Sequence, residues 1–363
     1  MAYRSRARVA KILAHEDADR VPYCAIRSAD VHRIVDTMDL EADHRALCLE
    51  GDFAFLLVEP EVELDRFRPY LAGLPDTAEV SYWGIGREAQ KTQEGWHAGH
   101  RMFHPLAEIH SVEGLKQFPF PDVARSGADQ GLEEHVRRLK EDGYTVLGQM
   151  SQTILETAYN MRGMPQLMVD FFERPRYVAF LFEQIAEQRR FQARRFAEAG
   201  VDILRIGDDI ASQKDLIVSP ALYKAWIKPH HASIIAEARR VRPDIPVKYH
   251  SDGNLTGLLP DLIEIGVTII NPVQPECMDL AEVKRAFGKD LTLWGCMPVQ
   301  SIFPHGSRDD IRRHLEFLMT HIAVDGGLVL KFTNFLVTER SLENLKVFFE
   351  IFCEIGQYDR INC

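Results

Sequence analysis

The sequence lacks any close pairing of its cysteines. Six cysteines are spread over the 363 residues, and none forms a CxxC motif. This distribution excludes a disulfide framework and is typical of reduced thiols, so we expect a cytoplasmic protein. Long apolar runs are also absent, since no stretch approaches the roughly 18 apolar residues that a membrane span requires. The charged opening, MAYRSRARVAKILAHEDADR, has no apolar core of the kind found in signal peptides.

Blocks of positive charge are missing as well. The formal net charge is −11, and lysines and arginines do not gather in any segment. Because binding to phosphate requires a basic face, we expect neither nucleic acid nor an anionic membrane surface as a partner.

No internal repeat, low-complexity segment or glycine-rich GxGxxG is found in the chain. The missing GxGxxG argues against a dinucleotide-binding open sheet. The composition, 46% hydrophobic, is sufficient for a large core. The length suits one barrel with an elaboration, or two domains.

Eight short apolar runs are present, and each is rich in β-branched or aromatic residues. Runs that are apolar at nearly every position are typical of strands buried on both faces, and therefore of parallel sheets. The eight expected strands cover residues 21–26, 53–58, 144–149, 201–206, 245–250, 267–272, 291–296 and 327–332.

Amphipathic helical patterns separate these runs. The pattern over 165–200 ends on Gly200, which we expect to cap the helix at its C-terminus. A second pattern opens with Ser219 as N-cap and Pro220 at the first helical position. Buried strands alternating with helices predict a (β/α)8 TIM barrel. A doubly wound open sheet is the alternative.

One connection is unusually long. It runs between the second and third strands, over about residues 60–143, and connections of this length usually have structure or function of their own. We therefore predict a single barrel domain over residues 1–363 that carries an insertion with a hairpin, and we expect this insertion to cover one mouth of the barrel.

Polar residues follow nearly every expected strand. In a barrel of this kind the reactive groups lie just past the carboxyl ends of the strands, so these residues predict one polar pocket. They are Arg27, Ser28, Glu59, Gln149, Ser151, Gln152, Asp208, Asp209, Gln213, His250, Asp252, Asn271, Gln274, Glu276, Cys296, Gln300, Thr333 and Asn334.

The stretch KYHSDGN, residues 248–254, contains the densest chemistry. His250 changes charge near neutral pH and also binds metals, so it is a candidate ligand or general acid–base. Asp252 is a candidate second ligand, or the partner that fixes the imidazole tautomer. Asn254 is expected to cap the following helix. A simple turn built from Asp, Gly and Asn is the alternative.

Other candidates also have structural interpretations. Asp208 and Asp209 are adjacent in a loop and point in different directions, so only one is expected to face the pocket, and either could instead cap a helix. Cys296 could be a small buried filler. Four histidines in the insertion, His97, His100, His104 and His110, fit no zinc spacing and suggest a solvated hairpin.

With these residues in place, the chain resembles the uroporphyrinogen decarboxylase superfamily nearly from end to end. The resemblance is carried by "RARVAKILAHEDADRVP", "SYWGIGRE", "HPLAEI", "ILETAYNMRGMPQLMVDFFERP", "AGVDILRIGDDIASQKDLIVSPALYKAWIKP" and "YHSDGNLTGLLPDLIEIGVTIINPVQPECMD". It implies the same (β/α)8 barrel.

The decarboxylase branch of that superfamily acts on a tetrapyrrole without a metal. Tyr159 in "AYNMRG" matches the tyrosine of this branch, and Glu59 occupies the place of its aspartate. Arg27 is nearly all that remains of the arginine-rich motif, and Asn334 stands where a histidine would be. A substrate with eight carboxylates calls for several guanidinium groups, and this opening segment supplies few.

The other branch contains zinc-dependent methyltransferases that work with corrinoid proteins. Their "HxCGN" motif corresponds to His250–Asn254, where Asp252 replaces the cysteine, and Asn334 lies where a second cysteine is expected. The resemblance implies a zinc site made of His250, Asp252 and a third ligand, for which Cys296, Glu59 and Asp209 are candidates. Such an oxygen- and nitrogen-rich site suits a methoxylated donor better than a thiol.

The leading hypothesis is therefore a corrinoid-linked methyltransferase that moves a methyl group between a small substrate and the cobalamin of a partner protein. Decarboxylation of a tetrapyrrole or pyrrole acid, and non-catalytic corrinoid or tetrapyrrole binding, remain open. The family also suggests a homodimer. The predicted catalytic residues are His250, Tyr159, Glu59 and Asp209; the predicted substrate-binding residues are Arg27, Gln149, Asp208, Gln274 and Asn334; and the predicted metal ligands are His250, Asp252 and Cys296.

Overall fold

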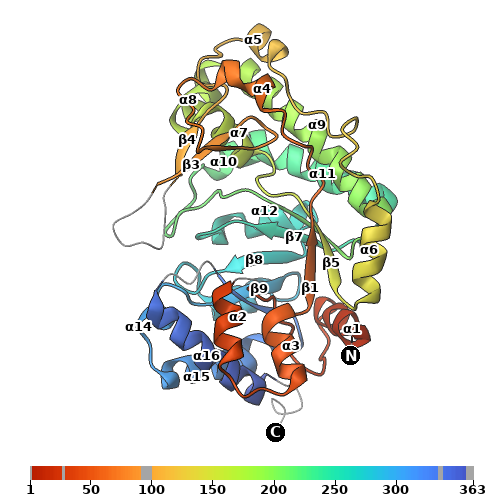
Figure 1. Ribbon diagram of the computed structural model, residues 1–363, viewed down its shortest axis with the longest axis vertical. Coiled ribbons are helices and arrows are strands. Elements are labelled where there is room, and N and C mark those ends of the chain that lie inside the picture. The colour runs from red at the N-terminus through yellow and green to blue at the C-terminus, as the bar shows by residue number, and fades with distance from the viewer. Residues whose placement is uncertain (1, 27–28, 91–99, 334–337, 357–363) are drawn as a thin grey trace.

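Seven parallel strands form a curled sheet at the centre of the protein (Figure 1). The computed structural model describes residues 2–26, 29–90, 100–333 and 338–356. The strands lie in the order β1-β5-β6-β7-β8-β9-β10. Their bounds are β1 Phe53–Leu56, β5 Thr145–Gln149, β6 Ile203–Gly207, β7 Val247–His250, β8 Ile269–Val273, β9 Thr292–Met297 and β10 Leu328–Phe332. The expected TIM-barrel type of α/β fold is confirmed.

The first expected strand, 21–26, is different from the others. It forms a single parallel bridge, between Tyr23 and Leu330, and no ladder. The Cys24 amide donates to the Leu330 carbonyl at 2.9 Å, and the Asp52 amide donates to the Tyr23 carbonyl at 2.9 Å. Pro22 has no N–H to extend the pairing. The segment therefore bridges the gap between β10 and β1, and the prediction of eight full strands was wrong by this one.

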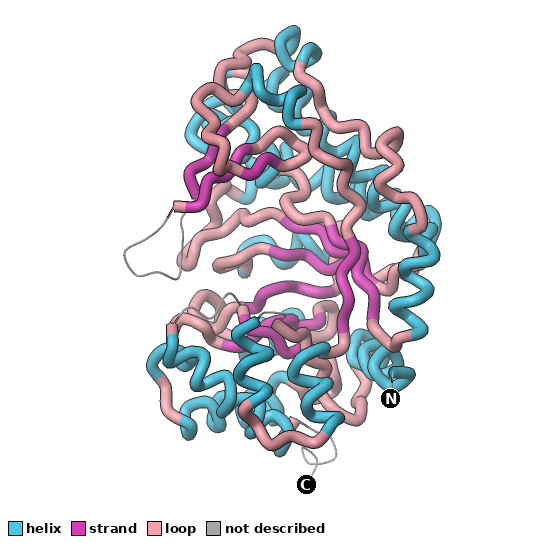
Figure 2. Tube along the Cα trace, in the orientation of Figure 1, coloured by secondary structure: helices cyan, strands magenta, loops and turns pink. Residues whose placement is uncertain are grey.

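The helices pack on the outer side of the curled sheet, and the strands lie inside this layer of helices (Figure 2). The other seven expected strands are confirmed to within two residues at each end. The longer helices are α1 Ala2–Leu13, α2 Ala29–Asp36, α3 Ala42–Glu50, α6 Leu132–Glu141, α7 Leu155–Arg162, α8 Met164–Glu173, α9 Pro175–Ala199, α11 Lys228–Val241, α13 Leu280–Phe287, α15 Arg308–Phe317 and α16 Glu339–Ile355. Two shorter helices, α12 Leu259–Glu264 and α14 Ile302–His305, complete this layer.

The expected helix ends are confirmed where caps were predicted. Gly200 adopts a left-handed conformation, with φ of 80°, at the end of α9. The Ser219 hydroxyl accepts from the Leu222 amide at 3.2 Å and so caps the short helix α10, Pro220–Leu222. A π-helical turn, Tyr223–Ile227, then connects α10 to α11. The pattern over 165–200 is divided into α8 and α9 at Pro175.

The insertion contains a small antiparallel sheet. Its strands are β2 Glu79–Val80, β3 Gly86–Ala89 and β4 His100–Phe103, in that order, so the predicted hairpin is confirmed as β3 with β4. Three short helices flank this sheet: α4 Leu64–Phe67, a 3-10 turn Arg68–Tyr70 and α5 Val112–Gln117.

Hydrogen bonds fasten the insertion to α7. The Leu106 amide donates to the Met161 carbonyl at 2.9 Å, and His104 Nδ1 lies 2.7 Å from the Asn160 carbonyl oxygen. Since α7 follows the carboxyl end of β5, the insertion lies on the side of the barrel where the pocket was predicted. In the described part of the chain, no helix is both long and apolar enough to cross a membrane.

Candidate functional site

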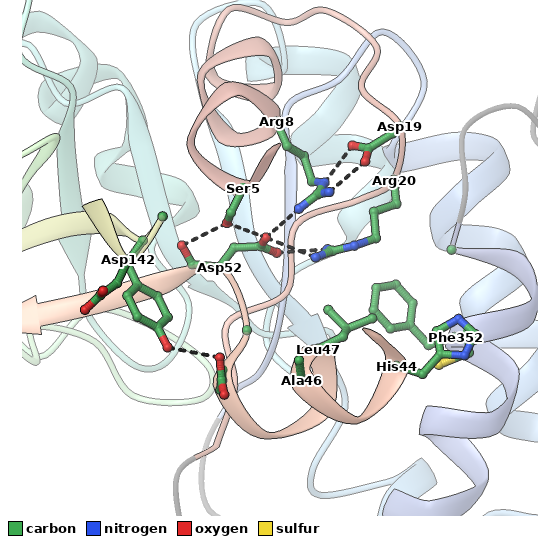
Figure 3. A pocket seen from close by; sticks show the side chains of 16 residues that line it. Ser5, Arg8, Asp19, Arg20, His44, Ala46, Leu47, Asp52, Asp142 and Phe352 are labelled. Carbon is green, nitrogen blue, oxygen red and sulfur yellow. Dashed lines mark hydrogen bonds and ion pairs between the residues drawn. The ribbon is translucent and has the colours of Figure 1, made fainter. Parts of the chain in front are cut away.

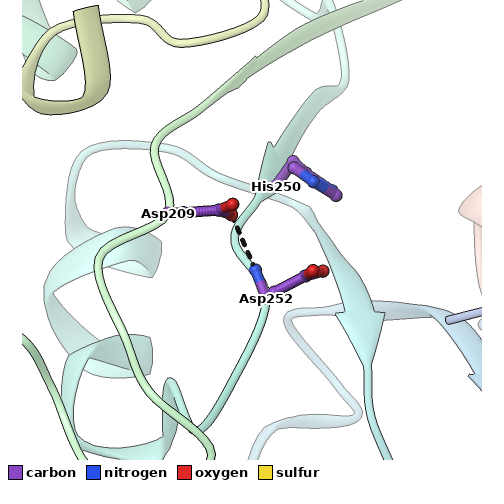
Figure 4. Close-up of side chains that lie close together, drawn as sticks. All are labelled: Asp209, His250 and Asp252. Carbon is purple, nitrogen blue, oxygen red and sulfur yellow. Dashed lines mark hydrogen bonds between the residues drawn. The ribbon is translucent and has the colours of Figure 1, made fainter. Parts of the chain in front are cut away.

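The carboxyl ends of β6 and β7 bring two aspartates and a histidine together (Figure 4). In Asp209, His250 and Asp252, one ligand atom from each side chain lies within 4.8 Å of the others. The Asp252 amide donates to Asp209 Oδ1 at 2.9 Å, so the two loops are also joined through the backbone. The sequence predicted all three as site residues, and the structure confirms that they lie together.

A buried asparagine sets the orientation of His250. Asn271 Nδ2 donates to the Trp294 carbonyl at 3.2 Å, which directs Asn271 Oδ1 toward His250 Nδ1, 2.9 Å away. Since a carbonyl oxygen only accepts, Nδ1 carries the proton and Nε2 keeps its lone pair. Burial, followed by Arg205 and Lys248, lowers the pKa of His250 well below its usual value. The ring is therefore neutral, as a metal ligand must be.

Two glycines allow these loops to approach each other. Gly207 has a φ of 154°, and a Cβ built there would lie 2.1 Å from the His250 carbonyl oxygen. Gly253 has a φ of 91°, and its Cβ would lie 2.4 Å from the Ser212 carbonyl oxygen. Any larger residue at either position would push β6 and β7 apart, or displace the loop that carries Asp252.

Asp208 points away from the pocket, which agrees with the expectation that only one of the adjacent aspartates faces it. Its carboxylate is fully buried and accepts from the Ile154 and Glu156 amides at the start of α7, at 2.9 and 3.0 Å. His231 Nε2 lies 2.8 Å from Asp208 Oδ2. Asp208 thus caps α7 from another element, and the role predicted for it, contact with substrate, does not fit this position.

That cap places Glu156 beside the cluster. Glu156 Oε2 accepts from the Asp209 amide at 3.2 Å. Burial, then the charges of Asp209 and Asp208, raises the pKa of Glu156 to about 8. Burial and Asp209 likewise raise the pKa of Asp252 to about 6. The carboxyl groups at this end of the barrel are therefore crowded, and each makes ionisation of the others less favourable.

The predicted tyrosine borders the same group of carboxylates. Burial, then the charges of Glu156 and Asp209, raises the pKa of Tyr159. Arg87, on β3 of the insertion, acts in the opposite direction on the pKa of both Tyr159 and Glu156. The insertion therefore contributes a positive charge to the site.

A pocket of about 210 Å³ opens onto these groups. Its floor includes Arg205 of β6, whose Nη1 donates to Ser151 Oγ at 3.0 Å. The other lining residues are Met150, Ser151, Gln152, Glu156, Gly207, Asp209 and His250. This volume is below the roughly 300–1,000 Å³ of sites for drug-sized ligands, so the pocket fits a small substrate.

The donor set of the cluster fits a divalent first-row metal ion. One neutral imidazole nitrogen and two carboxylate oxygens are borderline-to-hard ligands, which such ions accept at about 2.0–2.2 Å. Ligands on opposite sides of one ion lie at most about 4.4 Å apart, so a separation within 4.8 Å requires only a small movement of the side chains. A cation would also relieve the repulsion that raises the pKa of Asp252.

Two predicted residues lie elsewhere. Cys296 is fully buried, its carbonyl accepts from His314 Nε2 at 2.7 Å, and among the described residues the metal-ligand cluster does not include it. The prediction of Cys296 as a ligand is therefore corrected in favour of Asp209. Glu59 is exposed and lines a separate hollow of about 700 Å³ with residues of the insertion. Glu59 is not among the residues that line the pocket beside His250.

The remaining predicted residues lie around the site or outside the described chain. Gln149 is half-buried at the end of β5, and its Nε2 donates to Ser151 Oγ at 3.1 Å. Gln274 follows β8 and is 4% exposed. Asn254 Oδ1 accepts from the Thr256 amide at 3.1 Å within the loop, but the N-cap of the following turn is Leu255, so the prediction that Asn254 caps a helix was wrong. Arg27 and Asn334 fall outside the described residues.

Sequence reasoning missed the charged residues inside the strands. Arg205, Lys248 and Lys331 each interrupt an otherwise apolar strand near its carboxyl end. A single cation in such a run is itself a signal of an interior site, because an unpaired charge is costly to bury. Glu156 was also missed, since it lies in a helix and not directly after a strand.

The opposite end of the barrel has a hollow of its own, of about 330 Å³, next to the residues that precede β1 and β5 (Figure 3). Asp52, 1% exposed, accepts from Arg8 Nη1 at 2.7 Å, from Arg20 Nη1 at 2.9 Å and from Ser5 Oγ at 2.6 Å. Arg8 also binds Asp19 at 2.6 Å. The charged groups here pair with one another.

Comparison with known proteins agrees with this architecture. A methyltransferase from Methanosarcina mazei superimposes with a TM-score of 0.64 over 97% of this chain and 99% of its own, at 17% identity. The uroporphyrinogen decarboxylase of a Hydrogenobaculum species is 21% identical over 195 residues, and the chain spans about half the length of this relative. Residues 103–355 match the sequence profile of uroporphyrinogen decarboxylase. The chain therefore belongs to the uroporphyrinogen decarboxylase family of enzymes.

Proposed function

We propose that the protein is a metal-dependent methyltransferase that moves a methyl group between a small methoxylated substrate and the cobalamin of a partner protein. The observation that carries this proposal is the cluster of Asp209, His250 and Asp252, in which the imidazole presents a free Nε2 beside two carboxylates. A divalent cation held by these three side chains would supply Lewis acidity to an ether oxygen of the substrate.

The chain's own residues provide for the leaving group. In the proposed step the C–O bond of the methoxy group would break and its electron pair would stay on the oxygen. The electron pair of the partner's cob(I)alamin would form the new bond to the methyl carbon. That oxygen needs a proton. Glu156 lines the pocket next to Asp209 and is the proposed proton donor.

The size of the pocket and the match to a solved methyltransferase support this assignment. A volume of about 210 Å³ favours a small donor over a tetrapyrrole. The similarity to the Methanosarcina methyltransferase is one of fold, so it supports the proposal without deciding the chemistry.

The test is a spectral assay of purified protein supplied with Zn²⁺ or Co²⁺, cob(I)alamin and a panel of small methoxylated compounds. We expect conversion to methylcobalamin with at least one donor. The rate should fall about 100-fold or more in His250→Ala, which removes a ligand of the Lewis-acidic cation, and in Glu156→Gln, which removes the proposed proton donor. Asp19→Asn, which changes the other end of the barrel, is the matched control and should keep the parent rate. No conversion with any donor in the metal-loaded protein would refute the proposal.

Decarboxylation is the second candidate, because Tyr159 lies beside Glu156 and Asp209 and the family profile covers this region. Chromatography of uroporphyrinogen incubations tests it directly. Products with fewer carboxyl groups, abolished in Tyr159→Phe, would favour this reaction over methyl transfer. Tight binding of the corrinoid or the tetrapyrrole with no turnover of either substrate would instead indicate a binding protein.

A further inference from the structure

Three cations lie on the inner face of the barrel. Arg205 pairs in register with Lys248 on the neighbouring parallel strand, so their side chains share one face of the sheet. That face is the interior, because Lys248 Nζ lies 3.9 Å from the centre of the Trp294 ring, itself fully buried. Lys331, on β10, has a charge that acts on both Lys248 and His250.

These cations have few protein partners. In the described part of the chain, none of the three lies within 4.0 Å of a carboxylate oxygen. Lys248 is completely buried, and its Nζ has no hydrogen-bond acceptor among the described residues. The one side-chain hydrogen bond found there for Arg205 goes to Ser151 Oγ. Burial, then the charges of Lys331 and Arg205, lowers the pKa of Lys248 well below its usual value. An anion in the pocket would offset the repulsion among these groups and would therefore be held strongly.

Arg205 and Lys248 lie near open space and near an exposed aromatic ring. Arg205 is part of the pocket lining. Phe55 of β1 is 39% exposed, and Lys248 Nζ lies 5.8 Å from the centre of its ring. A ligand in this pocket therefore meets the guanidinium group of Arg205 directly, while the Lys248 amine lies buried behind the pocket wall.

We propose that Arg205 binds the carboxylate of the substrate in an anion site that Lys248 and Lys331 support through their charges, while the apolar body of the substrate packs on Phe55. The carboxylate is a monoanion, which suits a pocket that Glu156 and Asp209 also line better than a phosphate dianion does. This inference rests on the proposed function in one respect: it makes the methyl donor an aromatic or otherwise apolar methoxy-carboxylic acid, anchored by its acid group.

Binding without turnover tests the site separately from the chemistry. Calorimetric titration of the full-length protein with benzoate, with the isosteric but uncharged benzamide and with inorganic phosphate compares the three probes. We expect benzoate to bind at least about 10-fold more tightly than benzamide, as a charge-assisted pair requires. Phosphate should bind more weakly than benzoate.

The variants identify the groups responsible. Arg205→Gln should reduce the benzoate preference to about 1, and Lys331→Met should weaken it. Lys248→Met removes a buried unpaired amine, so this variant should remain folded and still lose part of the preference. Lys289→Met, which removes an exposed lysine, is the matched control and should leave the preference intact.

Equal binding of benzoate and benzamide, a preference for phosphate, or a benzoate preference that survives in both Arg205→Gln and Lys248→Met would overturn the anion site. If benzoate binds as expected but no methoxylated acid yields methylcobalamin, the anion site stands and the proposed methyl transfer fails. If only neutral donors yield methylcobalamin, the proposed methyl transfer stands and the anion site fails.

Discussion

The pKa values of buried carboxyl groups are shifted in opposite directions at the two ends of the barrel. At the amino-terminal ends of the strands, burial alone would raise the pKa of Asp52, but Arg20 and Arg8 outweigh it and the pKa is lowered. At the carboxyl ends, burial and neighbouring acids raise the pKa of Asp252 to about 6 and that of Glu156 to about 8. The first arrangement stabilises the folded chain, whereas the second is unfavourable until a cation or a proton arrives.

This contrast indicates that the charged residues at one end of the barrel have a structural role, whereas those at the other end have a functional one. Paired charges at the base of the barrel need nothing from outside the chain. Crowded carboxylates and unpaired cations at the mouth can be satisfied by a metal and an anionic ligand, and such an arrangement is characteristic of functional sites. Variants at the two ends should therefore differ in what they change.

The largest expected effect is on stability, at the base. Asp52→Ala should lower the free energy of unfolding by about 3–5 kcal/mol, because it leaves Arg8 and Arg20 without their shared partner. Urea denaturation measures this. Asp19→Ala removes a more exposed partner, 55% exposed, and should cost less than about 1 kcal/mol. Equal losses in the two variants would contradict the distinction drawn here.

The next effect is on metal affinity, at the mouth. Asn271→Ala frees the His250 ring and should weaken binding of Zn²⁺ or Co²⁺ about 10- to 100-fold, as loss of an orienting partner does. Titration with a competing chelator measures the affinity. Asn254→Ala removes only hydrogen bonds of the loop and should stay close to the parent. An unchanged affinity in Asn271→Ala would show that His250 needs no such support, or is not a ligand.

Asp252→Asn should have opposite effects on stability and on metal binding. The folded pKa, about 6, is above the value of 3.8 for an ordinary aspartate, so the native state retains the proton between these values and loses stability as pH rises through them. In chelator-treated protein, asparagine avoids this loss and should add about 1–2 kcal/mol above pH 6 and nothing near pH 3.

Denaturation of parent and variant at a series of pH values tests the sign, and chelator titration tests the accompanying loss of metal affinity. Asp244→Asn, at an exposed position, should follow the parent curve. A variant that is less stable than the parent at pH 8 would contradict the crowding of carboxylates at the mouth.

The smallest effect concerns Cys296. Because its side chain lies outside the cluster, Cys296→Ala should leave the metal stoichiometry unchanged, and the affinity should change by less than about 3-fold. Metal analysis after dialysis checks this. A loss of bound metal in this variant would show that Cys296, and not Asp209, is the third ligand.

Much of the fold could be read from the sequence, because parallel strands buried on both faces leave continuous apolar runs. Seven of the expected strands, the caps at Gly200 and Ser219, and the hairpin of the insertion were predicted correctly. The segment 21–26 was not, since an apolar run does not reveal how many backbone hydrogen bonds it will make.

The site was predictable only in part. His250, Asp252 and Asp209 follow strands directly, so their position in the chain was sufficient to bring them together. Glu156 depends on how Asp208 caps α7, which is a contact between distant elements. The direction of the Cys296 side chain depends on a local φ of 64°, and no spacing rule contains that information.

Segment 21–24 also determines the order in which the protein is completed. Strands β5 to β9 each have a sheet neighbour that is made before them, so they can pair while the chain is still emerging from the ribosome. The bridge from Tyr23 to Leu330 joins residues separated by almost the whole chain. Closing the barrel must therefore wait until Leu330 has been made, and the side of β1 that faces Tyr23 lacks this neighbour until then.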